Sequence, residues 1–301
     1  MERIHRRLSG LIAPAAVPYW QVAPLAGVFA VFFLLPLAIT VAVSFWRYTE
    51  YSMYPALVSD NYAAVFAGCW QELPDLCLTF KTYLSTLKFC VLVWLATLLL
   101  GFTVAYFLAF HVRSLTWQIV LFLVCTIPFW TSNVIRMISW VPLLGRNGLV
   151  NAALQSSGLT HAPLEWLLFS DFTVVLAFVH LYTMFMIVPI FNSMSRIDGA
   201  LLEAARDAGA SGWQTLWNVV VPLSKPGLVI GSIFVATLVM GDYVTIGVMG
   251  GQQIASVGKV IQVQLSYLQF PLAAANAVVL LGAVLGIIGV MTRLVDVRAE
   301  L

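Results

Sequence analysis

Charged residues are scarce in this sequence. Asp, Glu, Lys and Arg make up only 9% of its 301 residues, while 61% of the residues are hydrophobic. A soluble domain usually carries about 25% charged residues. Water therefore cannot surround most of the chain, which excludes an ordinary soluble enzyme and leaves no basis for a nucleic-acid partner. We expect a lipid bilayer around it instead.

Motifs of catalysis are also missing. The sequence has no Gly-x-Ser-x-Gly and no His-Glu-x-x-His, which disfavours an intramembrane enzyme. It has no Gly-x-x-x-x-Gly-Lys-Ser/Thr phosphate loop, so any nucleotide hydrolysis must come from another polypeptide. The four histidines fall in different segments, and we predict neither a metal site nor a cofactor: His5, His111, His161 and His180. A non-catalytic chain is expected.

Cysteine is rare and has no metal-binding spacing. Cys90 and Cys125 fall inside apolar stretches, and no Cys-x-x-Cys pair exists. Cys69 and Cys77 flank a polar segment that we expect outside the membrane. A disulfide there and two free thiols are both open at this point, because an oxidising periplasm permits the bond without requiring it.

Long apolar stretches predict an all-α, polytopic membrane protein. A helix needs about 20 residues to cross the hydrocarbon core, and six stretches qualify: Trp20–Phe45, Thr82–Phe110, Thr116–Leu143, Asp171–Ser195, Lys225–Met249 and Phe270–Arg293. An even number of spans puts both termini on one side. We therefore expect one membrane domain over residues 20–293, with cytoplasmic tails at 1–19 and 294–301.

The basic residues set the orientation. With the N-terminus in the cytoplasm, nine of them lie inside: Arg3, Arg6, Arg7, Arg113, Arg196, Arg206, Lys225, Arg293 and Arg298. Only four then lie outside: Arg47, Lys81, Arg146 and Lys259. This distribution satisfies the positive-inside bias of membrane proteins.

The cytoplasmic loop at residues 198–222 has strong helix signals. Asp198 can cap a first helix, which Gly209 can end. Ser211 and Gln214 have the spacing of a capping box for a second helix, which stops at Pro222. Two short helices joined at Gly209 would make an elbow that another protein could approach closely and move. The alternative is an ordinary loop lying along the bilayer surface.

This 198–222 loop resembles the EAA loop of binding-protein-dependent ABC importer permeases. Their pattern is Glu-Ala-Ala, three residues, Gly, nine residues, Ile, any residue and Leu-Pro. The residues that match are Glu203, Ala204, Ala205, Gly209, Val219, Val221 and Pro222, with Val replacing Ile and Leu conservatively. The resemblance implies that the loop is the coupling helix that inserts into a groove of the ATPase subunit, with Glu203 and Gly209 as docking determinants.

A second segment resembles spermidine/putrescine-type permeases. Residues 240–245 read Met-Gly-Asp-Tyr-Val-Thr and are followed by Gly250-Gly251, similar to the Gly-Asp-Phe/Tyr-Val-Thr-Pro pattern of that subfamily. Ile246 stands where Pro is usual, which predicts that a local kink is missing. The resemblance implies a small polar solute such as a polyamine, an opine, an aminophosphonate or an amino-acid-like compound.

The family resemblance also implies a multi-subunit machine in the bacterial inner membrane. Its expected parts are two ATPase subunits, a periplasmic solute-binding protein and a second permease chain, related to this one but different. The competing hypothesis is an ion-coupled secondary transporter or a channel, which needs no ATPase partner.

Three ionisable residues fall inside the predicted spans. Lys88, Arg136 and Asp242 each lie six or seven residues below an outer helix end, and so about 10 Å below the outer surface. They could form a neutralising cluster, with Asp242 paired to one base. Alternatively, Asp242 could line the translocation path with Tyr243 and Thr245 and accept an ammonium group. Two bases and one acid would leave a net positive charge, which favours a zwitterionic or anionic solute over a bare polyamine.

Overall fold

The computed structural model describes residues 17–49, 52–69 and 77–293. Within these ranges the fold is helical apart from one two-stranded hairpin, β1 (Arg47–Tyr48) paired antiparallel with β2 (Met53–Tyr54). This confirms the predicted all-α class. The predicted tail at 294–301 and residues 1–16 of the N-terminal tail lie outside the described residues.

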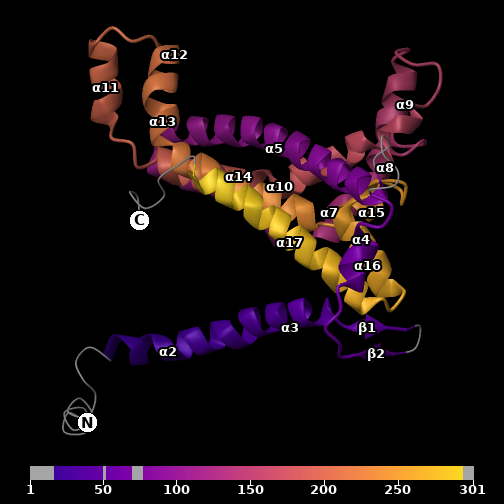
Figure 1. The fold of residues 1–301 in the computed structure, drawn as a ribbon. Coiled ribbons are helices and arrows are strands. Elements are labelled where there is room, and N and C mark those ends of the chain that lie inside the picture. Colours follow the sequence, from indigo (N-terminus) through magenta and orange to yellow (C-terminus); the bar gives the residue numbers. More distant parts are fainter. Residues whose placement is uncertain (1–16, 50–51, 70–76, 294–301) are drawn as a thin grey trace, which may run out of the picture.

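Four long helices form the body of the molecule (Figure 1): α5 (Leu78–Phe110), α10 (Asp171–Met194), α14 (Lys225–Gly241) and α17 (Phe270–Arg293). Buried apolar side chains such as Phe89, Phe178 and Val235 fill the space between them. Helix α10 packs closely on α5 and α14 because small residues face Met186. A Cβ at Gly101 would lie 2.7 Å from Met186 Cγ, and one at Gly231 would lie 2.8 Å from its Sδ. Such contacts are typical of helix packing in membranes.

The first span stands apart from this body. It comprises α2 (Val17–Phe29), the π-helical turn η1 (Ala30–Leu34) and α3 (Leu35–Val43). No side chain between Val22 and Val43 is buried, and Figure 1 shows the helix separated from the others except near its α3 end, which lies close to α17. This apolar helix must therefore be covered by lipid or by another chain.

Four helices are long and apolar enough to cross a membrane, and two further spans appear as bent helix pairs. Predicted spans one, two, four and six match single helical segments to within four residues at each end. Spans three and five were predicted as continuous helices, and this is wrong for both.

The third span breaks after 16 residues. Helix α6 (Leu115–Thr126) continues as a 3-10 turn, η2 (Ile127–Trp130), and then the backbone extends at Thr131 and Ser132. The following segment, which begins with α7 (Asn133–Ile138), is inclined by 92° to the first. Pro128 lacks a backbone N–H, and Thr131 Oγ1 donates to its carbonyl oxygen at 2.9 Å. These local bonds replace those of a continuous helix.

The fifth span breaks at Asp242. Helix α14 ends at Gly241, Asp242 has an extended backbone, and α15 (Val244–Met249) begins a new helix. The Asp242 carboxylate accepts the backbone N–H of Thr245 at 2.9 Å, which satisfies a donor in the first turn of α15. A break therefore forms although Ile246 replaces the proline of the subfamily pattern, and the prediction of a missing kink is wrong.

The remaining short elements gather at the two ends of the bundle (Figure 1). At one end, called the α11 end, the chain forms α11 (Gly199–Asp207), α12 (Gly212–Thr215), the π-helical turn η4 (Leu216–Val220) and α13 (Val221–Leu223). The opposite end, called the α9 end, holds the β-hairpin and α4 (Asp60–Val65), α8 (Val141–Leu144), α9 (Leu149–Ser156), η3 (Glu165–Leu167) and α16 (Val257–Ser266). The basic residues predicted to lie inside the cell are found at the α11 end wherever the structure describes them, and those predicted to lie outside are found at the α9 end.

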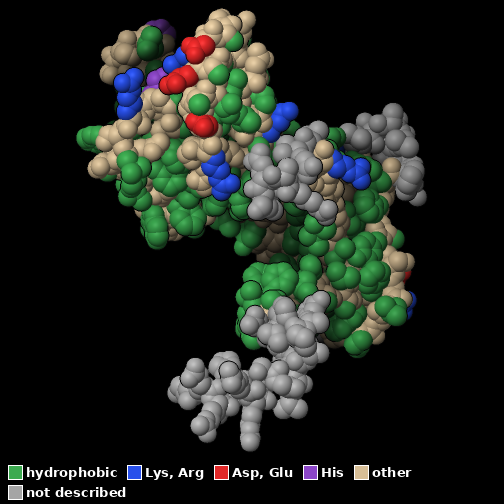
Figure 2. All heavy atoms as spheres, turned by 90° about the vertical axis from the view of Figure 1, so that its left-hand side faces the viewer, with side chains coloured by type: hydrophobic (Ala, Val, Ile, Leu, Met, Phe, Trp, Pro, Cys, Tyr) green, Lys and Arg blue, Asp and Glu red, His purple; other side chains and the backbone are tan. Residues whose placement is uncertain are grey.

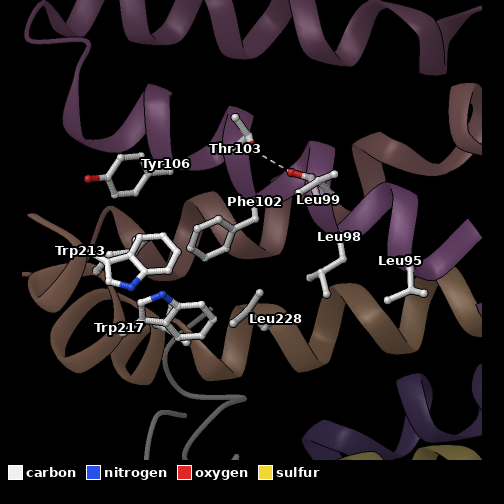
Figure 3. A pocket seen from close by; sticks show the side chains of 11 residues that line it. Leu95, Leu98, Leu99, Phe102, Thr103, Tyr106, Trp213, Trp217 and Leu228 are labelled. Atoms are coloured by element: carbon white, nitrogen blue, oxygen red, sulfur yellow. Dashed lines mark hydrogen bonds between the residues drawn. The ribbon is translucent and has the colours of Figure 1, made fainter.

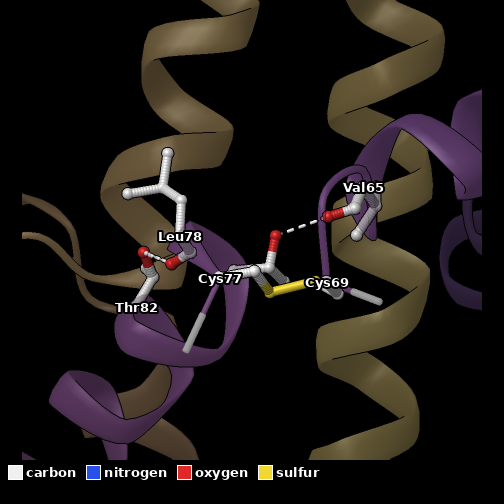
Figure 4. Close-up of a disulfide and its surroundings, with 6 residues drawn as sticks. Val65, Cys69, Cys77, Leu78 and Thr82 are labelled. Carbon is white, nitrogen blue, oxygen red and sulfur yellow. Dashed lines mark hydrogen bonds between the residues drawn. A yellow bond between two sulfur atoms is a disulfide. The ribbon is translucent and has the colours of Figure 1, made fainter. Parts of the chain in front are cut away.

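A disulfide joins two segments at the α9 end. Cys69 and Cys77 are bonded (Figure 4), so the first of the two alternatives is confirmed. Thr79 Oγ1 also donates to the carbonyl oxygen of Val65. Together these bonds tie the segment after α4 to the first turn of α5.

Candidate coupling loop and intramembrane polar site

The 198–222 loop forms the predicted pair of short helices. Asp198 Oδ1 accepts the N–H of Ala200 at 3.0 Å and caps α11. Gly209 has φ of +80°, a conformation that glycine adopts without strain. The capping box of α12 is complete, since Ser211 Oγ accepts from Gln214 N at 3.3 Å and Gln214 Oε1 accepts from Ser211 N at 2.8 Å.

The loop projects from the bundle with the proposed docking residues on its surface. Glu203, Ala204 and Gly209 are exposed, while Ala205 is half-buried. Leu202 points the other way and packs against the core. Figure 2 looks onto this end and shows acidic and basic side chains gathered over the projecting part, above a largely hydrophobic surface. A projecting element of this kind can bind a second protein on its outer side.

The loop is connected directly to the fifth span. η4 and α13 lead into α14, and the axis turns by 66° between the segment ending at Leu223 and the one beginning at Lys225. Pro222 is exposed at this turn, and the buried Ser224 donates its hydroxyl to the carbonyl of Val220. A displacement of α11 and α12 would therefore move the end of α14.

At its other end α14 leads to a polar site formed by Asp242, Tyr182 and Thr245, here called the Asp242 site. Tyr182 Oη donates to Asp242 Oδ2 at 2.7 Å, and Thr245 Oγ1 donates to the same atom at 2.6 Å. With the Thr245 N–H, the carboxylate accepts three hydrogen bonds. Tyr182 comes from α10, so the site joins two spans.

Arg136 is buried in α7 with only 8% of its surface exposed. Its Nη2 donates to Asn133 Oδ1 on the same helix, while its Nε has no hydrogen-bond partner in the described part of the chain. Nearby, Trp140, which precedes α8, donates its Nε1–H to Nδ1 of His180 on α10 at 3.1 Å. Buried guanidinium groups usually face a carboxylate or another strong acceptor, so this arginine keeps an unused donor inside the protein.

The predicted cluster of Lys88, Arg136 and Asp242 does not form. Lys88 Nζ pairs with Asp171 Oδ2 at 2.6 Å, and among the described residues Asp242 is in no ion pair within 4 Å. Asp171 lies in the first turn of α10, level with Lys88, and was not considered as a partner. With Asp171 included, the group has two bases and two acids. The predicted net positive charge, and with it the preference for a zwitterionic or anionic solute, is therefore wrong.

Comparisons with known proteins identify the family of this chain and the fold that it shares with solved structures. Residues 91–297 match the family model "Binding-protein-dependent transport system inner membrane component". The spermidine/putrescine transport system permease protein PotB of Escherichia coli (strain K12) is 31% identical over 289 residues, covering 93% of this chain and 100% of PotB.

Solved structures show the same fold. A bacterial ABC transporter involved in the import of the acidic polysaccharide alginate matches with a TM-score of 0.70 and 17% identity, covering 98% of this chain and 99% of that one. The same kind of transporter, in complex with an alginate pentasaccharide-bound periplasmic protein, matches with a TM-score of 0.67 and 16% identity over 92% and 93% of the two chains.

The family that was predicted from Glu203-Ala204-Ala205 and Gly209 is thus confirmed. The chain is a membrane transport component similar to spermidine/putrescine-type permeases. It belongs to the family of binding-protein-dependent transport system inner membrane components.

Proposed function

We propose that this chain is the permease subunit of an ABC importer that carries a polyamine or a similar small amine across the inner membrane. The observation that supports the proposal most is the 198–222 loop, a projecting pair of capped helices that continues into α14. ATP would be hydrolysed by a separate subunit bound to Glu203, Ala204, Ala205 and Gly209. The PotB relative supports an amine as the solute.

The Asp242 site is suited to an ammonium group. A carboxylate has about four acceptor positions, and three are occupied by Tyr182 and Thr245. One position remains for a passing cation, with Tyr243 exposed beside it. We propose Asp242, Tyr243 and Thr245 as part of the path. Arg136 and Lys88 stay candidates for the path, although Arg136 bonds to Asn133 and Lys88 pairs with Asp171.

The proposed assembly has two ATPase subunits, a second permease chain that differs from this one, and a periplasmic solute-binding protein. The first helix supports a second membrane chain, because no side chain of the apolar segment Val22–Val43 is buried. The distribution of basic residues supports an orientation with the α11 end in the cytoplasm. Both termini of the membrane domain would then face the cytoplasm.

Uptake into vesicles tests this function. The chain is reconstituted with its second permease and binding protein, and entry of labelled putrescine and spermidine is measured with and without the ATPase subunits and ATP. We expect uptake only when the ATPase and ATP are both present. Uptake driven by an ion gradient without the ATPase would establish the competing transporter hypothesis.

A further inference from the structure

An apolar groove runs along the α11 half of the bundle (Figure 3). It has a volume of about 780 Å³ and lies between one face of α5 and the segment from α12 to α14. Leu99, Trp213 and Trp217 line it and are 71%, 68% and 52% exposed. The hydroxyl of Thr103, which also lines it, donates to the carbonyl of Leu99 at 2.7 Å. The groove therefore offers a mostly apolar surface suited to hydrocarbon, and its remaining polar groups are the Tyr106 hydroxyl and the indole N–H groups of Trp213 and Trp217.

A second cavity of about 310 Å³ adjoins the groove at Tyr106, which lines both. It is basic: Arg113, from the connection after α5, and Arg206, from α11, line it together with His111. No acidic residue lines it. Among the described residues, neither arginine is in an ion pair within 4 Å. Two arginines converging from separate elements suit a phosphate group, which accepts several charge-assisted hydrogen bonds.

The positions of the two cavities match one leaflet of a bilayer. The groove extends along α5 from Leu95 to Tyr106, which is about 16 Å of helix and close to half of the ~30 Å hydrocarbon core. Arg113 lies just beyond the end of α5 at Phe110, where headgroups are expected. Tyr106 lies between the two, a common place for an amphipathic ring at the membrane interface.

We propose that the groove and the basic cavity together bind one anionic phospholipid. Its phosphate would lie between Arg113 and Arg206, and an acyl chain would follow the groove past Trp213 and Trp217. Basic pockets beside membrane helices bind anionic headgroups in this way. Only the naming of the leaflet, the inner one, rests on the proposed function. Because Arg206 belongs to α11, the bound lipid would link the 198–222 loop to α5 and hold it against the bundle.

Native mass spectrometry tests the site on the assembled transporter. The complex is purified after reconstitution in phosphatidylethanolamine vesicles containing phosphatidylglycerol as the minor component, and retained phosphatidylglycerol is counted. We expect Arg113→Gln combined with Arg206→Gln to lower retention by about tenfold, since two charge-assisted contacts are removed. The matched control is Arg196→Gln, an exposed arginine at the same end that lines neither cavity; it should retain the lipid.

Leu99→Trp tests the groove separately, because a larger side chain would obstruct the acyl chain while leaving both arginines in place. We expect it to lower retention as well. Should the combined variant fail to assemble, Arg113→Gln alone carries the test, since Arg113 is outside α11. Retention is measured without ATP or solute, so the outcome does not depend on transport, and Arg113→Gln removes one phosphate contact without changing α11.

Three results would overturn the proposal. The first is wild-type retention by the arginine variant. The second is loss of retention in the arginine variant alone, together with displacement by soluble glycerol phosphate, which would indicate a site for a free phosphate. The third is a photocrosslinker at Leu99 that reaches the second permease instead of lipid, which would show that a protein helix covers the groove.

Discussion

The 198–222 loop and the Asp242 site lie at opposite ends of α14, and at both places a helix stops, the backbone extends and a new helix starts. They differ in the sequence distance over which their bonds act. In the loop, every capping bond joins residues two or three positions apart. At the Asp242 site, the bond from Tyr182 spans 60 positions and joins two helices. The caps of the loop can therefore form whatever the rest of the bundle does, whereas the Asp242 site forms only when α10 and α14 pack together.

Asp242→Asn should have the largest effect. The amide can accept at only one atom, and its NH2 group would face hydroxyl donors, so we expect a loss of about 3 kcal/mol in stability. The thermal unfolding of the purified complex measures it, with uptake measured in parallel. Tyr182→Phe is the milder companion, at about 1 kcal/mol, because it removes one bond. Unchanged unfolding with abolished uptake for Asp242→Asn would show that the carboxylate serves only the solute.

Gly209→Ala should cost about 1 kcal/mol in the stability of the loop, because alanine is strained at φ of +80°. Apart from the two neighbouring residues in the chain, no atom of the described residues lies within 4 Å of a Cβ built at this position, so the backbone conformation alone causes the cost. Gly209→Asn is the matched control, since Asn tolerates this conformation better. Hydrogen exchange of α11 and α12 measures the effect. An equal loss for both variants would point to a contact with a partner instead of backbone strain.

Lys88→Met should cost about 1 kcal/mol or less, because the pair with Asp171 is partly exposed. Adding Asp171→Leu should recover part of the loss, since no unpaired carboxylate then remains. A double-mutant cycle on thermal unfolding measures the coupling. Coupling of Lys88 to Asp242 instead would restore the cluster predicted from the sequence.

Glu203→Gln should leave the stability of this chain unchanged, since the side chain is exposed and makes no hydrogen bond or ion pair among the described residues. Its effect should appear only in solute-stimulated ATP hydrolysis by the assembled transporter. A drop in the unfolding temperature of the isolated chain would contradict the assignment of Glu203 to docking.

The loop could be predicted from the sequence because its signals are local. Asp198, Gly209 and the Ser211–Gln214 pair each act within a few residues, and each was identified. The spans were predicted well where one apolar stretch makes one helix. The break at Asp242 was missed because the hydrophobic pattern continues across it, although Asp242 three positions before Thr245 is a helix-capping signal.

The residues that bond to Asp242 and to Lys88 from neighbouring helices could not be predicted from local sequence signals. Tyr182 looks like any other aromatic residue inside an apolar span, and only the packing of α10 on α14 brings its hydroxyl to the carboxylate. Asp171 was taken only as the start of a span. From the sequence, Asp171 was expected at the outer end of its span and Lys88 about 10 Å below the outer surface, so only the packing of α5 against α10 reveals that the two side chains meet.

Crosslinking from α11 tests the central claim most directly. A photocrosslinker is placed at the exposed Ala204, and its control at the exposed Gln155 on α9, at the opposite end of the molecule. In the assembled transporter, the crosslink from Ala204 should reach the ATPase subunit, and that from Gln155 should not. No ATPase adduct from Ala204, or one from Gln155 in its place, would contradict the proposed function.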